Sequence, residues 1–154
     1  FQGSIADNIC RFTQPDPTKV INAAQMAGIH EMVLELPNGY DTIIGANSGA
    51  LSAGQRQRVG LARAVYDRPK LILLDEPNSN LDEQGEKDLH SAIKRLKKEG
   101  CTVIIITHKT SILSLTDKLL VLKGGYARNF GDTREVLQSI QQNISKIAQL
   151  KPKV

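Results

Sequence analysis

The sequence contains few cysteines and few aromatic residues. Its 154 residues include two cysteines, three tyrosines, three phenylalanines and no tryptophan. Cys10 and Cys101 lie far apart and form no Cys-x-x-Cys pair. The sequence therefore predicts neither a disulfide framework nor a zinc site, and it favours a reducing compartment. No apolar run approaches the ~20 residues that a membrane-spanning helix needs, and no signal peptide is visible.

The chain also lacks a strong excess of either charge. Twenty lysines and arginines stand against 16 aspartates and glutamates, which gives a net charge of +4, and the basic residues are scattered. This balance favours an ordinary solvated surface over a nucleic-acid-binding patch. A hydrophobic content of 40% with 23% charged residues is typical of globular proteins, and the length suffices for one core.

Hydrophobic patterns predict a helical first part followed by a parallel sheet. Residues 1 to about 66 favour helices, and the last of these begins after Ser52. The apolar runs at 71–74 and 103–106 are rich in Leu, Ile and Val, which indicates parallel strands buried on both faces. A helix from about residue 83 to 98 would connect them. We expect strands at 119–122 and 126–130, then an amphipathic helix at 133–150 with Val136, Leu137, Ile140, Ile144 and Ile147 facing the core.

Two neighbouring carboxylates follow the first apolar strand. Asp75 ends the strand, where its carboxylate could reach a hydrated Mg²⁺, and Glu76 points elsewhere and could polarise an attacking water. The alternative, a surface Asp-Glu pair, would be favoured for the dipeptide alone. The polar segments at 52–55 and 77–82 favour the catalytic interpretation.

A second chemical signal lies at the start of the helix that Ser52 caps. Ser52 and Gly54 stand where free backbone N–H groups and the helix dipole favour an anion. Small residues there let the backbone approach a phosphate closely. The alternative is an ordinary capped helix with no ligand.

These segments together resemble the nucleotide-binding domain of ABC transporters. Residues 51–55, Leu-Ser-Ala-Gly-Gln, look like the signature motif, and residues 71–76 resemble the Walker B strand. Residues 78–82 resemble the D-loop, and Thr107-His108 resembles the H-loop. The exporter-type sequences at residues 39–42 and 77–82 are most similar to those of the ATPases of type I secretion systems, which export proteases and lipases from Gram-negative bacteria.

The resemblance implies a set of residue roles. Glu76 would polarise the attacking water, His108 would contact the γ-phosphate, and Asp75 would bind Mg²⁺. Residues that would contact ATP or the dimer interface are Ser52, Ala53, Gly54, Gln55, Ser79 and Asp82. Ala53 stands where the family's motif has glycine, and residues 45–49 lack the acidic residue of the common exporter pattern.

The resemblance also implies a fold and partners. The fold is α/β, the P-loop NTPase fold of ABC ATPases, with a helical subdomain at 1–66, the C-terminal half of the core at 67–132, and a helix and tail at 133–154. ATP and Mg²⁺ are the implied cofactors. The implied partners are a second nucleotide-binding domain in a head-to-tail homodimer, a transmembrane domain, and membrane-fusion and outer-membrane secretion components. The implied location is the cytoplasmic face of the bacterial inner membrane, and no nucleic-acid partner is expected.

No Gly-x-x-x-x-Gly-Lys-Ser/Thr loop, the Walker A motif that holds ATP phosphates, occurs in the sequence. The chain also begins at Phe1 rather than at methionine. We therefore expect the C-terminal part of a nucleotide-binding domain from a longer polypeptide, inactive as an isolated piece because the Walker A half is missing. Residues 1–4 fit either a native segment or the remnant of a cleavable tag.

Two other functions compete with the exporter interpretation. A chromosome-maintenance ATPase lobe would show long heptads before the signature and a basic face, and neither is present. A naturally truncated half-domain would act as a non-catalytic interaction module, which only the length of the parent reading frame decides.

Overall fold

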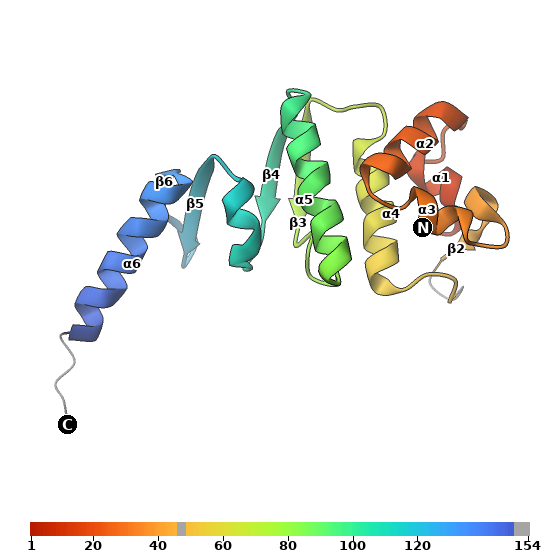
Figure 1. Cartoon of the computed structure of the whole chain (residues 1–154). Coiled ribbons are helices and arrows are strands. Elements are labelled where there is room, and N and C mark those ends of the chain that lie inside the picture. Colours follow the sequence, from red (N-terminus) through yellow and green to blue (C-terminus); the bar gives the residue numbers. More distant parts are fainter. Residues whose placement is uncertain (46–48, 150–154) are drawn as a thin grey trace. The chain divides into compact units, whose positions relative to one another are not determined.

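The computed structural model describes the backbone of residues 1–45 and 49–149 and the side chains up to residue 142 (Figure 1). The chain divides into two compact units, Phe1–His108 and Lys109–Val154. The subdomain limits at residues 66 and 132 that the resemblance implies stay a prediction. None of the described helices combines the length and the apolar content that crossing a bilayer requires.

The first unit begins with short helices gathered around one longer helix. Asp16 caps the second helix by accepting hydrogen bonds from two backbone N–H groups, and Pro17 occupies the first helical position, as its fixed φ allows. The longer helix, α4 (Ala53–Val65), packs against α1 and α2. The other elements are β1 (Gly3–Ser4), α1 (Ile5–Ile9), α2 (Pro17–Met26), α3 (His30–Leu34), η1 (Gly39–Asp41) and β2 (Ile43–Ile44).

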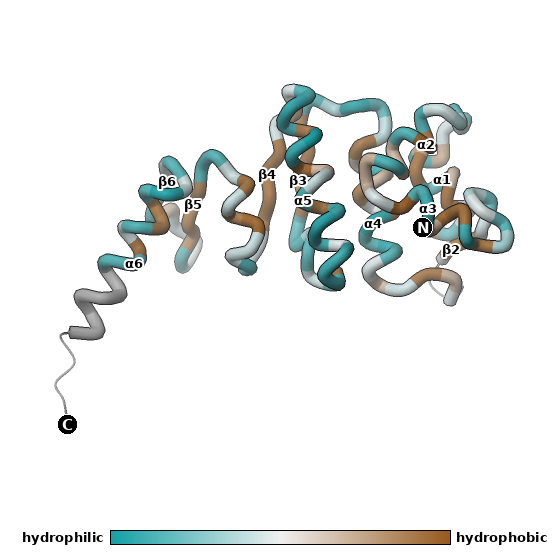
Figure 2. Tube along the Cα trace, viewed as in Figure 1, coloured by the Kyte–Doolittle hydropathy of each residue, from teal (hydrophilic) through white to brown (hydrophobic). Residues whose placement is uncertain are grey.

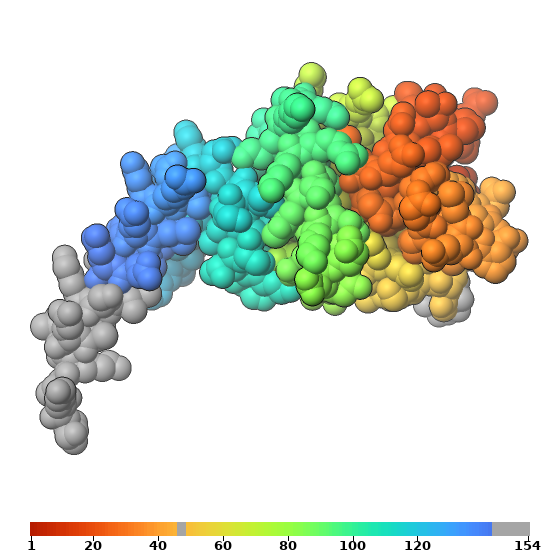
Figure 3. All heavy atoms as spheres, viewed as in Figure 1, coloured from red at the N-terminus to blue at the C-terminus, as the bar shows by residue number. Residues whose placement is uncertain are grey.

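A parallel strand pair with one connecting helix completes the first unit. Strands β3 (Leu71–Asp75) and β4 (Thr102–Ile106) pair in parallel, with Asp75 opposite Ile106. Between them runs α5 (Glu83–Lys98), whose apolar side chains give the helix a buried stripe that packs against β4. Gly100, at φ +79°, turns the chain after the helix. In the space-filling view, the green atoms of α5 adjoin the red and orange atoms of the N-terminal helices (Figure 3).

Within the described residues of this unit, only one face of the strand pair β3–β4 is covered. Ile72 and Leu74 are buried on the helix side. The alternate positions carry large apolar side chains that are about half exposed or more: Leu71, Leu73, Ile104 and Ile106. The prediction that both faces are buried is therefore wrong for this structure, in which the described residues cover only the face that carries Ile72 and Leu74. The apolar residues of both strands are brown in Figure 2.

The second unit contains an antiparallel hairpin and a helix. After η2 (Thr110–Leu115), strands β5 (Lys118–Lys123) and β6 (Tyr126–Asp132) pair through a Gly124-Gly125 turn in which both glycines have positive φ. Helix α6 (Thr133–Gln149) packs against both strands. Val136 is buried, as predicted for the apolar stripe, but Leu137 is 37% exposed. The side chains of Ile144 and Ile147, and the predicted end of the helix at Leu150, lie outside the described residues.

Candidate functional site

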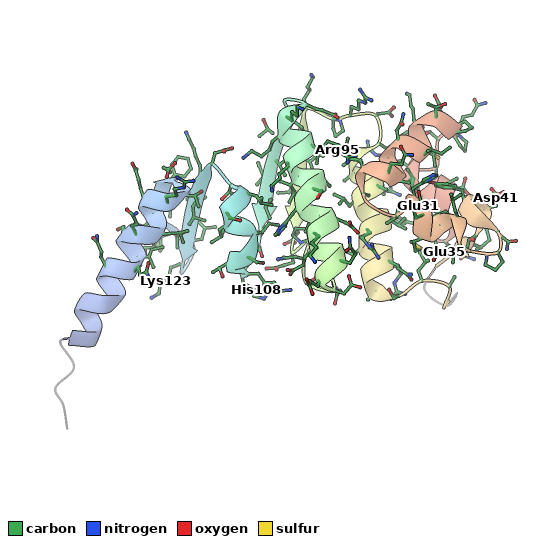
Figure 4. The ribbon with its side chains drawn as sticks, in the orientation of Figure 1. Glu31, Glu35, Asp41, Arg95, His108 and Lys123 are labelled. Carbon is green, nitrogen blue, oxygen red and sulfur yellow. The ribbon has the colours of Figure 1, made fainter. Side chains whose placement is uncertain are left out.

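The predicted catalytic residues gather where the two parallel strands end. Asp75 closes β3 and Glu76 follows it, while Thr107 and His108 follow β4. The backbone N–H of Glu76 donates to the carbonyl of Ile106 at 2.8 Å, which extends the pairing one residue beyond the strands. His108 lies beyond the arrowhead of β4 in Figure 4. Because parallel strands end at the same edge of a sheet, the register alone brings these side chains together.

Glu76 and His108 are in direct contact. Oε1 of Glu76 accepts the backbone N–H of His108 at 3.1 Å and lies 2.8 Å from its Nδ1. A carboxylate is an acceptor, so Nδ1 is the donor in this contact. Oε2 of Glu76 is buried and has no hydrogen-bond partner among the described residues. A carboxylate with one oxygen held in place and the other unpaired is suited to accept a hydrogen bond from a water molecule.

The backbone of Glu76 is held in a conformation that few residues adopt. Its φ is +46°, in the left-handed region that disfavours residues with a Cβ. Its carbonyl accepts hydrogen bonds from Gln57 Nε2 at 2.8 Å and from the Ser79 N–H at 3.2 Å. Such strain persists only where neighbouring contacts over-determine the conformation, and it is common at functional sites.

The predicted signature residues form the first turn of α4. The hydroxyl of Ser52 accepts the N–H of Gln55 at 3.2 Å, and the side chain of Gln55 accepts the N–H of Ser52 at 2.8 Å. This capping box leaves the N–H groups of Ala53 and Gly54 at an exposed helix start. Ala53 is the first helical residue and has no positive φ, so alanine suits the position where the family's motif has glycine.

Gly54 brings the start of α4 against the loop that follows β3. A Cβ at Gly54 would lie 2.7 Å from the carbonyl oxygen of Asn80, closer than such atoms pack. Glycine is therefore required by the close approach of two backbones. The signature turn and the D-loop segment are in van der Waals contact within one chain.

The two D-loop residues expected at the dimer interface, Ser79 and Asp82, are exposed. Asp82 caps α5 by accepting the N–H of Gly85 at 2.7 Å. The Ser79 hydroxyl accepts from the side-chain amide of Asn80 at 3.1 Å. Between them and the strand, Asn78 is fully buried, and the Thr107 hydroxyl lies 3.4 Å from its Oδ1.

Asp75 is the candidate metal ligand. Its carboxylate is exposed at the end of β3 beside Glu76. Among the described residues no cluster of three His, Cys, Asp or Glu side chains could hold a metal ion by itself. One or two carboxylates are what Mg²⁺ uses when phosphate oxygens and water supply its other ligands. A single exposed carboxylate at this strand end therefore fits hydrated Mg²⁺ bound to a phosphate.

The comparison with known families agrees with this arrangement of motifs. A family model described as ABC transporter matches residues 3–79, half of the 154 residues. The chain belongs to the ABC transporter family.

Relatives of this ABC transporter chain have several described roles. It is 46% identical to the type I secretion system ATP-binding protein PrsD of Rhizobium meliloti, over 91% of this chain and 24% of PrsD. It is 40% identical to the cyclolysin secretion/processing ATP-binding protein CyaB of Bordetella pertussis, over 89% of this chain and 19% of CyaB. It is 38% identical to an ATP-dependent lipid A-core flippase of Burkholderia pseudomallei, over 90% of this chain and 23% of the flippase. The chain thus spans about a quarter or less of the length of these relatives.

The fold is similar to that of a solved ABC exporter. A bacterial Atm1-family ABC exporter with ATP bound matches with a TM-score of 0.81 and 33% identity, over 90% of this chain and 24% of that chain. The predicted ABC ATPase fold is thereby confirmed.

Two polar side chains of α4 in this ABC transporter chain bond to neighbouring elements of the same chain. Gln57 bonds to the carbonyl of Glu76 at 2.8 Å, and Arg58 pairs with Asp88 of α5 at 3.2 Å. Asn78, in the loop after β3, is fully buried. The sequence of residues 56–58 fits either a helix face that meets a partner or a solvated one. In the structure the side chains of Gln57 and Arg58 bond to neighbouring elements of the same chain, and whether this face meets a partner stays a prediction. A side-chain bond to a distant loop leaves no periodic pattern, so no sequence signal marks Gln57.

Proposed function

We propose that the protein containing this chain hydrolyses ATP to drive export of a polypeptide across the bacterial inner membrane, as in type I secretion. The observation that carries the ATPase proposal is the Glu76 carboxylate, anchored on His108 through Oε1 with Oε2 unpaired. Relatives described as secretion ATP-binding proteins, at 46% and 40% identity, support export of a polypeptide.

In this proposal the residues at the strand ends serve the hydrolysis. Asp75 would hold Mg²⁺, Oε2 of Glu76 would accept a hydrogen from the attacking water, and His108 would keep Oε1 in place. Bound ATP supplies the phosphoanhydride that water cleaves. Ser52, Ala53, Gly54 and Gln55 would present the N-terminus of α4 to the phosphate held by a second copy, with Ser79 and Asp82 at the interface.

The proposed partners follow from the same arrangement. A head-to-tail homodimer would complete each site, and a transmembrane domain of the same transporter would meet the helical subdomain, proposed as residues 1–66. Membrane-fusion and outer-membrane secretion components would complete the export path. We place the ATPase at the cytoplasmic face of the inner membrane.

A second candidate substrate is a lipid. Lipid A-core flippase relatives, at 37–38% identity, support it, and that identity is lower than for the two secretion proteins. In either case the ATPase site would be the same, since none of the residues at the strand ends would touch the transported molecule.

The test uses Glu76→Gln in the full-length protein. Loss of general-base help lowers turnover by about 10²–10⁴-fold, while ATP affinity stays close to that of the wild type because the amide keeps the shape of the side chain. Glu83→Gln, an exposed residue in the first turn of α5, is the matched control and should leave turnover unchanged. Turnover of Glu76→Gln within a few-fold of the wild type would overturn the assignment.

A second measurement separates the two substrates. The purified transporter in lipid vesicles is assayed for ATPase stimulation by a secreted polypeptide of the source bacterium and by lipid A. Stimulation by the polypeptide alone supports type I secretion, and stimulation by lipid A alone replaces it with lipid transport.

A further inference from the structure

The side chain of Gln57 joins the signature helix to the loop that carries Glu76. Nε2 donates to the Glu76 carbonyl at 2.8 Å and lies 3.4 Å from the Ser79 hydroxyl. Oε1 of the same amide accepts the backbone N–H of Asn80 at 3.3 Å. Donor and acceptor of one amide thus bind both ends of the turn from Glu76 to Asn80. Gln57 itself belongs to the body of α4, which packs against α1 and α2.

This contact acts on the strained residue of the site. The left-handed φ of Glu76 is unfavourable for a residue with a Cβ, so the conformation needs outside support. The backbone N–H of Glu76 is fixed by Ile106, and its carbonyl is fixed by Gln57 and by Ser79 within the turn. Gln57 is therefore the only described residue outside the turn that bonds to this carbonyl. Without it, the turn could relax toward the right-handed region and rotate the Glu76 side chain away from His108.

We propose that Gln57 is a positioning residue, whose side-chain amide fixes the turn from Glu76 to Asn80 and thereby holds the Glu76 carboxylate against His108. The kinetic part of this proposal rests on the proposed function, in which Glu76 polarises the attacking water. Because Gln57 lies one turn beyond the anion-favouring start of α4, it also ties the position of the signature turn to the carboxylate of the same chain.

The first experiment measures amide hydrogen exchange in the full-length protein without nucleotide. The backbone N–H of His108 donates to Glu76 Oε1, yet Gln57 does not touch His108. In Gln57→Ala, we expect exchange at His108 and at Asn80 to accelerate by at least about tenfold, since local opening governs exchange. Exchange within β3 should stay unchanged, because its N–H groups bond elsewhere.

A near-isosteric variant separates the donor from the acceptor. Gln57→Glu keeps an oxygen for the Asn80 N–H but removes the donor to the Glu76 carbonyl. We therefore expect acceleration at His108 and little change at Asn80. This variant also keeps the proposal testable if Gln57→Ala fails to fold. Gln84→Ala is the matched control, because Gln84 is an exposed amide on α5 that bonds Asp88 and not the site.

The second experiment measures ATPase kinetics. Both Gln57 variants should lower kcat by about 10- to 100-fold, the range for a misplaced catalytic group, and leave KM for ATP within about twofold. Added to Glu76→Gln, either change should cause no further loss, since residues that act through one group are non-additive.

Each part of the proposal has a result that overturns it. Wild-type exchange at His108 in both variants would show that Gln57 does not hold the carboxylate. A loss of kcat that adds fully to that of Glu76→Gln would show a general structural role. If Glu76→Gln keeps wild-type turnover, the proposed function fails instead, and the exchange result still decides whether Gln57 positions the turn.

Discussion

One oxygen of Glu76, Oε1, is bonded twice by His108, from its backbone N–H at 3.1 Å and from its Nδ1 at 2.8 Å. The two residues come from the ends of different strands, so the parallel register sets their contact. The other oxygen, Oε2, is buried and has no partner among the described residues. An unsatisfied buried acceptor costs free energy, so we expect a donor, such as a water molecule or a ligand, to bind this oxygen in the working enzyme.

The first prediction concerns His108. His108→Ala removes the ring donor to Glu76 Oε1 and leaves only the backbone N–H to hold that oxygen. We expect ATP turnover of the full-length protein to fall by about 10²-fold, the size of the loss when one preorganised donor is removed. His90→Ala is the control, since this half-buried histidine lies on α5 and makes no contact with Glu76. Equal turnover in the two variants would remove His108 from the site.

The second prediction separates the chain's own ATP from that of its partner. Ser52 starts α4 at an exposed position, so arginine there would obstruct a docked phosphate without disturbing the core. In the full-length protein, Ser52→Arg should abolish turnover and leave ATP affinity, measured by calorimetry on the monomer, within a few-fold of the wild type. Loss of ATP binding by the monomer would contradict the head-to-tail arrangement.

The sequence predicted that Asp75, Glu76 and His108 follow neighbouring strands because their positions depend on short-range signals. Helix α5 has its predicted bounds, since Asp82 caps its start and Gly100, at φ +79°, turns the chain after its end. Strands β3 and β4 follow from their apolar runs, and strands in parallel place Asp75, Glu76 and His108 at one edge. The roles of these residues stay predictions.

What the sequence did not predict depends on contacts between distant segments. The apolar runs of β3 and β4 contain no alternation, which favours burial on both faces, and nothing in them indicates that one face is exposed. Helix α1 spans five residues, too few for a periodic pattern, although its capping box of Ser4 and Asp7 is visible in the sequence. Gln57 binds a loop 19 residues away, and such a bond follows only from the packing of α4 beside the sheet.

The third prediction concerns stability at high pH. Burial, with a smaller contribution from the charge of Glu31, raises the pKa of Tyr40 from 10.0 to about 12, and the Tyr40 hydroxyl bonds His30 Nδ1 at 2.8 Å. Because the folded state holds the phenolic proton more tightly than the unfolded state, this stabilisation is complete below pH 10 and is lost as the pH rises through about 12. In Tyr40→Phe, the free energy of unfolding should therefore decline less steeply across this interval than in the wild type.

Urea unfolding of the chain, followed by circular dichroism at several pH values, measures this difference. Below pH 10 the two unfolding curves should differ by a constant amount, about 1 kcal/mol for the lost hydrogen bond. Parallel curves through the whole alkaline interval would contradict the raised pKa of Tyr40.

The last prediction compares two glycines of α4. Gly54→Ala places a Cβ 2.7 Å from the Asn80 carbonyl oxygen, a backbone atom, so the loop after β3 must shift. Gly60→Ala adds the same methyl group to the same helix, with no atom within 4 Å. Both changes favour the helix by about 0.5–1 kcal/mol, but at Gly54 overpacking costs typically about 1–3 kcal/mol. We therefore expect the free energy of unfolding to rise in Gly60→Ala and to fall in Gly54→Ala, as measured by urea unfolding.

ATP turnover of the full-length protein should fall only in Gly54→Ala, because a displaced Asn80 loses its bond to Gln57 and loosens the turn that carries Glu76. A gain of stability in both variants would show that α4 and the loop after β3 pack less closely than this structure has them.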